Sequence, residues 1–225
     1  GTLRRHGAVA DVIPVAPRWP GVDVAAAVRD PRWIEAVRGA RGVFFSGGAQ
    51  ERIVDTLQPD GASTPLLNAI RDVQRAGGVI AGTSAGAAIM STRMFRDAVD
   101  VVAVLKGALR DGQETDRGLG FVGPDVFVDQ HFLRRGRIAR LLPAMAAYGA
   151  SIGLGVDEDT AAIVQGDVVE VVGARGVLVV DFAEARVSGP PFELHGARLS
   201  YLEAGDRYDL RRREVLPSPA KRDGR

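Results

Sequence analysis

Short apolar runs alternate with helical segments between Gly42 and Met94, and this alternation restricts the possible folds more than any other feature of the chain. The runs Gly42–Ser46 and Val79–Ala81 are typical of buried strands, and a helix capped by Ser63 or Thr64 is predicted between them. Strands that alternate with helices form parallel sheets, because each right-handed crossover returns the chain to the same edge. The alternation therefore predicts the α/β class.

The bulk composition indicates one domain and no strongly charged partner. The chain has 225 residues, of which 46% are hydrophobic, and this is enough for a single domain over residues 1–225 with a sizeable core. Lys and Arg number 29 against 28 Asp and Glu, so we expect neither a nucleic acid nor an anionic membrane as partner. The chain has no cysteine, which excludes disulfides, thiolate metal sites and a cysteine nucleophile.

The two ends of the chain give separate predictions. Thr2–His6 followed by Gly7 is typical of the last turn of a helix, so we expect a preceding strand and helix to be missing from this sequence. The start lacks the apolar core of a signal peptide and no run has the length of a membrane span, which favours a soluble protein. We expect it to be cytoplasmic, with an exported form as the alternative if an N-terminal segment is missing. Pro217–Arg225 is polar and basic and is expected to fray.

The segment Gly82-Thr83-Ser84-Ala85-Gly86 matches the G-x-S-x-G nucleophile elbow. It lies between a predicted strand and a predicted helix, as that motif requires. The glycines permit the sharp turn that exposes the Ser84 hydroxyl, and the Ala85 amide at the helix start can face an oxyanion. The alternative is a glycine-rich turn that binds a phosphate or nothing. The context favours Ser84 as a nucleophile.

A second glycine turn, Gly47-Gly48, follows the preceding predicted strand. Backbone amides there can approach a ligand closely because no side chain intervenes. In a parallel sheet both turns lie at the carboxyl edge, where ligands bind. Alone this would be an ordinary tight turn, and its pairing with the elbow is what favours a shared site.

A nucleophilic serine needs a base, and the chain has three histidines. His6 lies in the terminal turn and His195 in a late segment close to prolines. His131 directly follows the predicted strand Val126–Asp129 and is expected at the carboxyl edge, so it is the favoured base. Spacing leaves the acid that orients the histidine open among five residues: Asp125, Asp129, Asp157, Glu158 and Asp159.

Four arginines follow His131 within a short stretch: Arg134, Arg135, Arg137 and Arg140. If a helix begins near Gly136, Arg137 and Arg140 share one of its faces. Arginine forks bind carboxylates in a bidentate fashion, so a cluster beside a base suggests an acidic group on the substrate. The alternative is a solvated helix face.

The remaining segments have weaker signals. Val24–Arg38 is predicted to contain a helix, and Phe95–Gly118 has no clear period and is predicted to be a long functional loop. Short apolar runs separated by glycine and acidic turns follow Gly153, and these are typical of strands and hairpins.

Four blocks of the sequence together resemble the cyanophycinases and the related aspartyl dipeptidases of the peptidase E type. The blocks are Phe45-Ser46-Gly47-Gly48-Ala49-Gln50, Ala81-Gly82-Thr83-Ser84-Ala85-Gly86-Ala87, Asp129-Gln130-His131-Phe132 with Arg135, Arg137 and Arg140, and Gly153-Leu154-Gly155-Val156-Asp157-Glu158-Asp159-Thr160-Ala161. They occur in the order found in that family. The third block is the most specific and points to the cyanophycinase branch.

The resemblance implies a class I glutamine-amidotransferase-like α/β fold, a three-layer sandwich with a mostly parallel central sheet. It implies a single catalytic domain, commonly dimeric, with no metal and no organic cofactor. Ser84 matches the nucleophile of the family, His131 its base and Glu158 the acid that orients the histidine. Under this interpretation the amides of Gly48 and Ala85 hold the oxyanion.

The resemblance also implies a substrate pocket and a substrate class. Cyanophycin, a poly-aspartate backbone with arginine on its side chains, would be cleaved to β-aspartyl-arginine dipeptides. Ala49 departs from the family, which usually has Asp or Asn there. The residues that match the pocket are Gln50, Asp129, Gln130, Arg135, Arg137 and Arg140.

Two other functions compete with this interpretation. One is an aspartyl or isoaspartyl dipeptidase that acts on short peptides rather than polymer. The other is a catalytically silent, amidotransferase-like binding protein, for which Ala49 is a weak argument.

Overall fold

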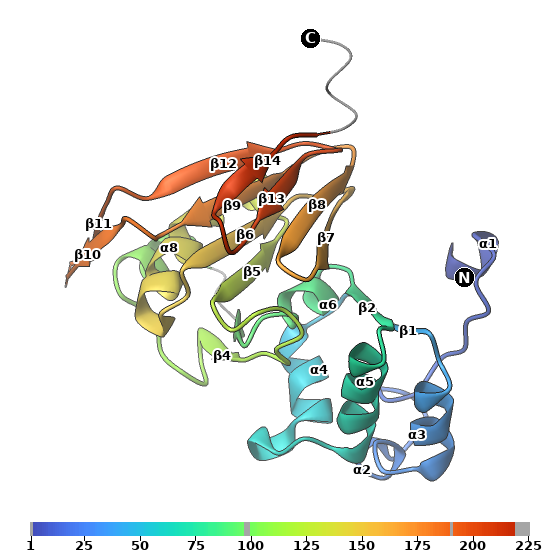
Figure 1. The fold of residues 1–225 in the computed structure, drawn as a ribbon. Coiled ribbons are helices and arrows are strands. Elements are labelled where there is room, and N and C mark those ends of the chain that lie inside the picture. The colour runs from blue at the N-terminus through green and yellow to red at the C-terminus, as the bar shows by residue number, and fades with distance from the viewer. Residues whose placement is uncertain (1, 97–99, 190, 219–225) are drawn as a thin grey trace. The chain divides into compact units, whose positions relative to one another are not determined.

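The computed structural model describes residues 2–96, 100–189 and 191–218, and the chain divides into two compact units. The first comprises Gly1–Val43 and Arg52–Ile80, and the second comprises Phe44–Glu51 and Ala81–Arg225. Helices and strands both occur throughout, so the mixed α/β class is confirmed (Figure 1).

The first unit is mainly helical, and local capping signals set its helices. Thr64 caps α5, its Oγ1 accepting from the Leu67 amide at 3.2 Å. The helix expected over Val24–Arg38 is divided in two, because Pro31 starts a new helix whose N-cap is Asp30. The helices are α1 (Thr2–Arg5), α2 (Val24–Ala27), α3 (Pro31–Arg38), the 3-10 helix η1 (Pro59–Gly61) and α5 (Pro65–Arg75). Three elements pass between the units: β1 (Gly42–Phe45), α4 (Gln50–Leu57) and β2 (Val79–Gly82).

The second unit contains most of the strands. Its helices are α6 (Ala85–Ala88), α7 (Val101–Leu105), α8 (Ile138–Tyr148) and the 3-10 helix η2 (Leu133–Arg135). Its strands are β3 (Arg93–Phe95), β4 (Thr115–Arg117), β5 (Val126–Gln130), β6 (Ile152–Val156), β7 (Thr160–Gln165), β8 (Val168–Gly173), β9 (Val177–Asp181), β10 (Arg186–Ser188), β11 (Glu193–His195), β12 (Arg198–Leu202), β13 (Arg207–Asp209) and β14 (Glu214–Leu216).

Two four-stranded sheets form the core of this unit, with strand orders β12-β9-β6-β5 and β14-β13-β8-β7. Side chains alternate along each strand, so β5 sends Val126 and Val128 into one apolar cluster and Phe127 into another. The first cluster also contains Val169 and Tyr208 from the other sheet, whereas the second contains residues of α8. The sheet that holds β5 and β6 is therefore covered on both faces.

The expected mostly parallel central sheet stays a prediction. In the four-stranded sheet that holds β5, the pair β5 and β6 is parallel, and the pairs β6 with β9 and β9 with β12 are antiparallel. This arrangement still places the ends of β5 and β6 at one edge.

The segment expected as a long loop contains regular structure. Asp100 caps α7 by accepting from the amides of Val102 and Ala103 at 3.0 and 2.9 Å, and β4 pairs antiparallel with β3. Its residues 97–99 lie outside the described part. At the other end, residues 219–225 of the tail expected to fray also lie outside it. Ser218 is buried and its hydroxyl donates to the Gly205 carbonyl at 2.7 Å, so the chain is packed up to this residue.

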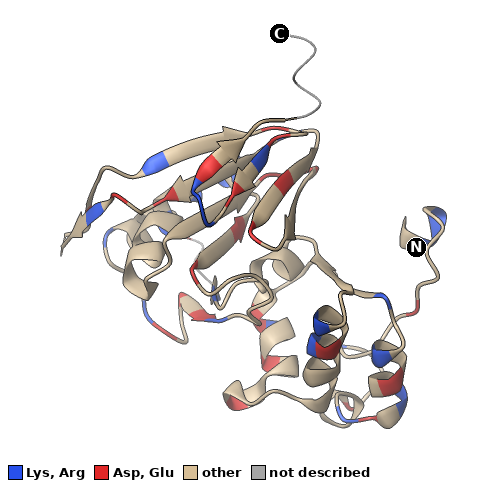
Figure 2. Ribbon diagram, in the orientation of Figure 1, with Lys and Arg blue, Asp and Glu red and all other residues tan. Residues whose placement is uncertain are grey.

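Charged residues of both signs are spread over the strands and helices of the second unit (Figure 2), and Asp181 is a buried one. Its carboxylate accepts from Arg213 at 2.6 Å and from Arg198 at 2.9 Å, and also from the Ala183 amide at 2.8 Å. Burial raises the pKa of Asp181, but the hydrogen bonds and charges of its donors outweigh burial and hold the pKa below its ordinary value. The ionised form is thus favoured in the folded state.

This shift gives a stability prediction with a defined sign. Because the folded pKa is depressed, the stabilisation is complete above the unfolded pKa of about 3.9 and is lost as the pH falls through the folded value. We expect Asp181→Asn to lower the free energy of unfolding at pH 7 by about 1.5–3 kcal/mol. In this variant the free energy of unfolding should also decrease less steeply than in the wild type as the pH falls. Urea titrations from neutral to acidic pH measure both effects. Asp11→Asn, which changes an exposed carboxylate, is the control. An equal dependence of the free energy of unfolding on pH in both variants would contradict the prediction.

Candidate active site

The turn between β2 and α6 holds Ser84 in a strained backbone conformation, with φ 53° and ψ −112°. The glycines on either side permit it. A Cβ on Gly82 would lie 2.2 Å from the Gly86 carbonyl oxygen, and one on Gly86 would lie 2.3 Å from the Phe45 carbonyl oxygen. Positions 82 and 86 therefore accept only glycine, which has no Cβ. The turn has the strand-turn-helix geometry of a nucleophile elbow.

Ser84, His131 and Glu158 form a continuous hydrogen-bonded chain. Ser84 Oγ lies 3.1 Å from His131 Nε2, and His131 Nδ1 lies 2.9 Å from Glu158 Oε1. His131 directly follows β5 and Glu158 lies just beyond β6, and these two strands are parallel neighbours. The topology thus brings both loops to one edge of the sheet.

The other candidate acids have different surroundings in the described structure. Asp129 pairs with Arg140, and the Asp157 carboxylate accepts from the Leu133 amide at 2.8 Å. Asp125 is exposed, and its main-chain carbonyl accepts from the amides at the start of β6. The carboxylate that lies against His131 Nδ1 is that of Glu158.

The contact with Glu158 favours one tautomer of the His131 ring. The hydrogen bond from His131 lowers the pKa of Glu158, and the nearby positive charges of Arg134 and Arg175 lower it further. An ionised carboxylate can only accept, so His131 Nδ1 carries the proton. In the neutral imidazole, the lone pair on Nε2 then faces the Ser84 hydroxyl. This arrangement can withdraw a proton from the serine.

Two sets of backbone amides lie beside Ser84. A Cβ on Gly47 would lie 3.3 Å from Ser84 Cβ, so the Gly47-Gly48 turn closely approaches the serine. The first amide of the α6 turn that donates within the turn is that of Gly86, to the Thr83 carbonyl at 2.9 Å. The Ala85 amide lies one residue before it. First-turn amides of a helix have no acceptor within the helix. The predicted oxyanion donors are therefore near the serine.

Two glutamines of the predicted pocket have different roles in the fold. Gln50 Nε2 donates to the Phe95 carbonyl at 2.8 Å, which links the start of α4 to β3. Gln130 is 6% exposed, and its side-chain oxygen has no hydrogen-bond partner among the described residues. A buried acceptor without a donor is unusual, so Gln130 retains the capacity to bind a donor.

Asp129 and Arg140 are both buried, and their contact with substrate stays a prediction. Their side chains are 1% and 3% exposed, and Arg140 donates from Nε and Nη2 to Asp129 at 2.8 and 2.6 Å. The guanidinium also lies 4.2 Å from the Phe95 ring centroid. A buried charge needs a close partner, and Arg140 finds a carboxylate within its own chain.

Arg135 and Arg137 differ from Arg140 and from each other. The Arg137 side chain is 13% exposed, and its Nη1 donates to the Gln130 carbonyl at 2.6 Å. Burial lowers the pKa of Arg137 to about 10, and the positive charge of Arg140 contributes. Arg135 is exposed. Arg134 belongs to the predicted arginine cluster but not to the pocket residues that the resemblance implies, and its Nε lies 3.5 Å from Glu158 Oε2. The register of β5 and β6 could have shown this proximity.

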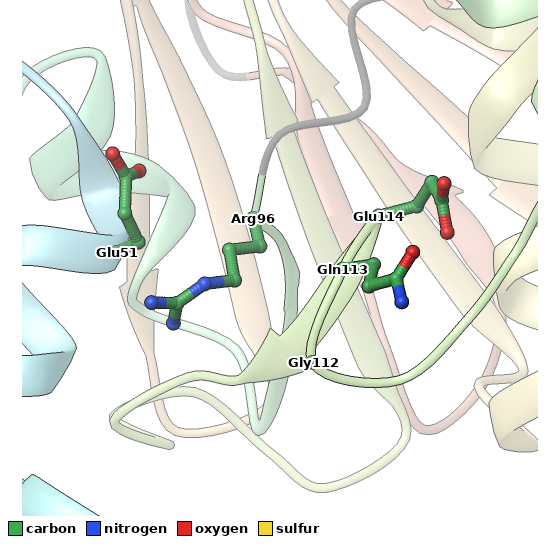
Figure 3. A pocket seen from close by; sticks show the side chains of 5 residues that line it. All are labelled: Glu51, Arg96, Gly112, Gln113 and Glu114. Carbon is green, nitrogen blue, oxygen red and sulfur yellow. The ribbon is translucent and has the colours of Figure 1, made fainter.

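A cavity of about 400 Å³ is lined by Glu51, Arg96, Gly112, Gln113 and Glu114 (Figure 3). Of these, Glu51 directly follows Gln50 in the sequence. Arg96 pairs with Asp116 at 2.7 Å. Hydrogen bonds from Arg110 lower the pKa of Glu114 to about 2, so this carboxylate stays ionised at neutral pH. The cavity therefore has a polar, charged wall.

Within the described ranges, no three His, Asp or Glu side chains gather as metal ligands would. None of the helices in that part of the chain is long and apolar enough to cross a membrane.

Comparison with known proteins gives consistent matches to peptidases. A family model described as Peptidase family S51 matches residues 22–172. The cyanophycinase of Trichormus variabilis is 35% identical over 192 residues, covering 81% of this chain and 61% of that protein. The cyanophycinase of Geminocystis herdmanii is 35% identical over 196 residues, covering 83% of this chain and 69% of that protein.

A solved structure is also similar. The crystal structure of a peptidase from an acI-B1 Actinobacterium matches with a TM-score of 0.56 and 26% identity, covering 82% of this chain and 66% of that one. The chain spans about three fifths of the length of the Trichormus relative, 61%. The family match includes both glycine turns, His131 and Glu158, which are the residues that the geometry brings together. The chain belongs to peptidase family S51.

Proposed function

We propose that this chain carries the active site of a serine exopeptidase that cleaves cyanophycin or a related β-aspartyl-arginine peptide. The hydrogen-bonded chain from Ser84 through His131 to Glu158 is the observation that carries the proposal. A serine beside a correctly protonated histidine is an activated nucleophile. The cyanophycinase relatives support the substrate class.

The proposed reaction is acyl transfer in two steps. Ser84 Oγ attacks the scissile carbonyl carbon while His131 Nε2 takes the hydroxyl proton, and the amides of Gly48 and Ala85 stabilise the oxyanion. His131 then gives the proton to the leaving amine, and the C–N bond breaks to leave an acyl-enzyme. Water, deprotonated by His131, attacks the acyl carbon. The bond from that carbon to Ser84 Oγ then breaks as His131 returns the proton to Ser84, which releases the acid. Glu158 stabilises the imidazolium in both steps.

We further propose a class I glutamine-amidotransferase-like three-layer sandwich, a single catalytic domain over residues 1–225 and a homodimer. The parallel β5–β6 pair and the elbow at the end of β2 support the fold. The two-unit division would then lie within one catalytic domain. Sedimentation of the purified chain tests the dimer.

The proposal is tested by product analysis on purified cyanophycin. We expect β-aspartyl-arginine to appear as the product. A dipeptidase would instead hydrolyse α- or β-aspartyl dipeptides and leave the polymer intact. A silent binding protein would do neither and would not react with a serine-directed fluorophosphonate, whereas the activated Ser84 hydroxyl should react.

Arg137 is the arginine that we propose to bind an acidic group of the substrate. It keeps a fraction of its side chain exposed, and it lies 3.7 Å from Asp129, whose closer partner at 2.6 Å is Arg140. We expect Arg137→Ala to raise KM and to weaken binding by about 2–5 kcal/mol. Arg137→Lys should recover only part of this, because a point charge cannot form a bidentate contact.

Steady-state kinetics on a soluble β-aspartyl-arginine oligomer measures the effect of both Arg137 variants. Arg186→Ala, which removes an exposed arginine of β10, is the control. Specificity constants near wild type in both Arg137 variants would show that the substrate does not use this charge.

A further inference from the structure

The loops that carry His131 and Glu158 leave neighbouring strands side by side. The parallel register pairs Gln130 of β5 with Val156 of β6, so His131 and Asp157 are the next residues along each chain. At His131 the backbone turns to φ 48°, which ends the extended strand. Beyond this point the sheet ladder no longer holds the histidine against Glu158. Other contacts must fix their separation.

Asp157 supplies such a contact through its side chain. Its Oδ1 accepts a hydrogen bond of 2.8 Å from the Leu133 amide, the first amide of η2. That amide has no acceptor within the short helix, so Asp157 acts as its cap from another segment. The residue is 8% exposed, and its own amide donates to the Gly176 carbonyl at 3.2 Å, next to β9. Asp157 therefore ties η2 to the sheet.

Phe132 adds a packing contact between the same two segments. Its side chain is fully buried, and a Cβ on Gly155 would lie 2.1 Å from its ring. The ring therefore occupies the space beside β6 that a side chain would need. Arg134 adds a weaker and more exposed ion pair to Glu158. Among these contacts, the one made by Asp157 is both buried and directional.

We propose that Asp157 is a positioning residue, whose carboxylate caps η2 and thereby holds His131 Nδ1 within hydrogen-bond distance of Glu158. It acts through the Leu133 amide, since that is what its carboxylate contacts. The effect on turnover rests on the proposed function, whereas the effect on the His131–Glu158 contact does not. What matters under this proposal is the position of the accepting oxygen rather than the negative charge.

A pair of substitutions separates position from charge. Asp157→Asn keeps an accepting oxygen in place and removes the charge, whereas Asp157→Glu keeps the charge and moves the oxygen by one methylene. Asp157→Ala removes both. The control is Asp125→Ala, which deletes an exposed carboxylate at the opposite end of β5 while leaving the main-chain bonds of residue 125 intact.

Two measurements are made on the full chain of each variant. Steady-state kinetics on a β-aspartyl-arginine oligomer gives kcat and KM separately. Nitrogen NMR on isotope-labelled histidine, assigned by the signal lost in His131→Gln, reports whether Nδ1 of His131 carries the proton bound to Glu158. We expect Asp157→Ala and Asp157→Glu to lower kcat about a hundredfold with little change in KM. The Nδ1–H signature should be weakened in both.

Asp157→Asn should lose less than about tenfold in kcat and keep the NMR signature, as should Asp125→Ala. A Glu variant more active than the Asn variant would overturn the proposal in favour of a role for the charge. A wild-type kcat and a wild-type Nδ1–H signal in both Asp157→Ala and Asp157→Glu would also overturn it. If Asp157→Ala fails to fold, the Asn and Glu pair still decides. If the wild-type chain cleaves nothing, the proposed function fails and the NMR comparison alone tests the positioning role.

Discussion

Ser84→Ala is expected to abolish hydrolysis and leave the fold unchanged. The Oγ that the substitution removes is the atom 3.1 Å from His131 Nε2, and the proposed mechanism has no other nucleophile. In serine hydrolases the loss of the nucleophile lowers kcat by about a millionfold, because the remaining groups cannot replace covalent catalysis. The stability of the variant should be close to that of the wild type, since both residues carry a Cβ in the same strained turn.

The measurement is product formation from cyanophycin, together with urea unfolding to show that the variant is folded. Ser188→Ala, which removes an exposed hydroxyl of β10 that donates to Glu193, is the matched control and should be fully active. A Ser84→Ala enzyme that retains a tenth of wild-type activity would rule out Ser84 as the nucleophile.

Breaking the buried pair of Asp129 and Arg140 is expected to destabilise the protein strongly. Removing Asp129 takes the carboxylate away from the buried Arg140, and removing Arg140 leaves Asp129 with the longer 3.7 Å contact to Arg137, so we expect either change to lower the free energy of unfolding by about 3–5 kcal/mol. The side chains are 1% and 3% exposed, so water cannot compensate the remaining charge. Replacing both together, as Asp129→Leu with Arg140→Met, should be much less damaging than either single change.

Urea unfolding of Asp129→Leu, Arg140→Met and the double variant measures these effects, with the exposed Arg186→Ala as control. Arg137→Ala should behave differently, because we expect its effect mainly on KM. Single variants of the pair that unfold at the wild-type urea concentration would contradict the interpretation of Arg140 as a structural residue.

Local signals in the sequence were sufficient for the elbow and for the helix caps. Gly82 is required by its contact with Gly86 within the same turn, and Thr64 caps α5 with its own side chain. Both features depend on neighbours within a few residues, whereas Gly86 is required by its contact with the distant Phe45 of β1. The same local rules explain why Pro31 divides the expected helix.

The partners of the charged residues could not be predicted from spacing. Five acids lay within reach of His131 along the chain, and the register of β5 with β6 brings Glu158 to its Nδ1. Spacing places Arg140 beside Arg137 in a short stretch of arginines but does not indicate its partner. The packing of α8 against β5 brings Arg140 to Asp129. These outcomes depend on contacts between distant segments.

The left-handed backbone at position 84, with φ 53°, places the activity of the serine in conflict with the stability of the fold. Glycine is the residue that this conformation accepts without strain, and replacing a strained residue by glycine relieves on the order of 1 kcal/mol. A chain with glycine at this position would be more robust in its fold and would carry no hydroxyl. Random mutation under selection for stability alone would therefore drift toward inactive descendants.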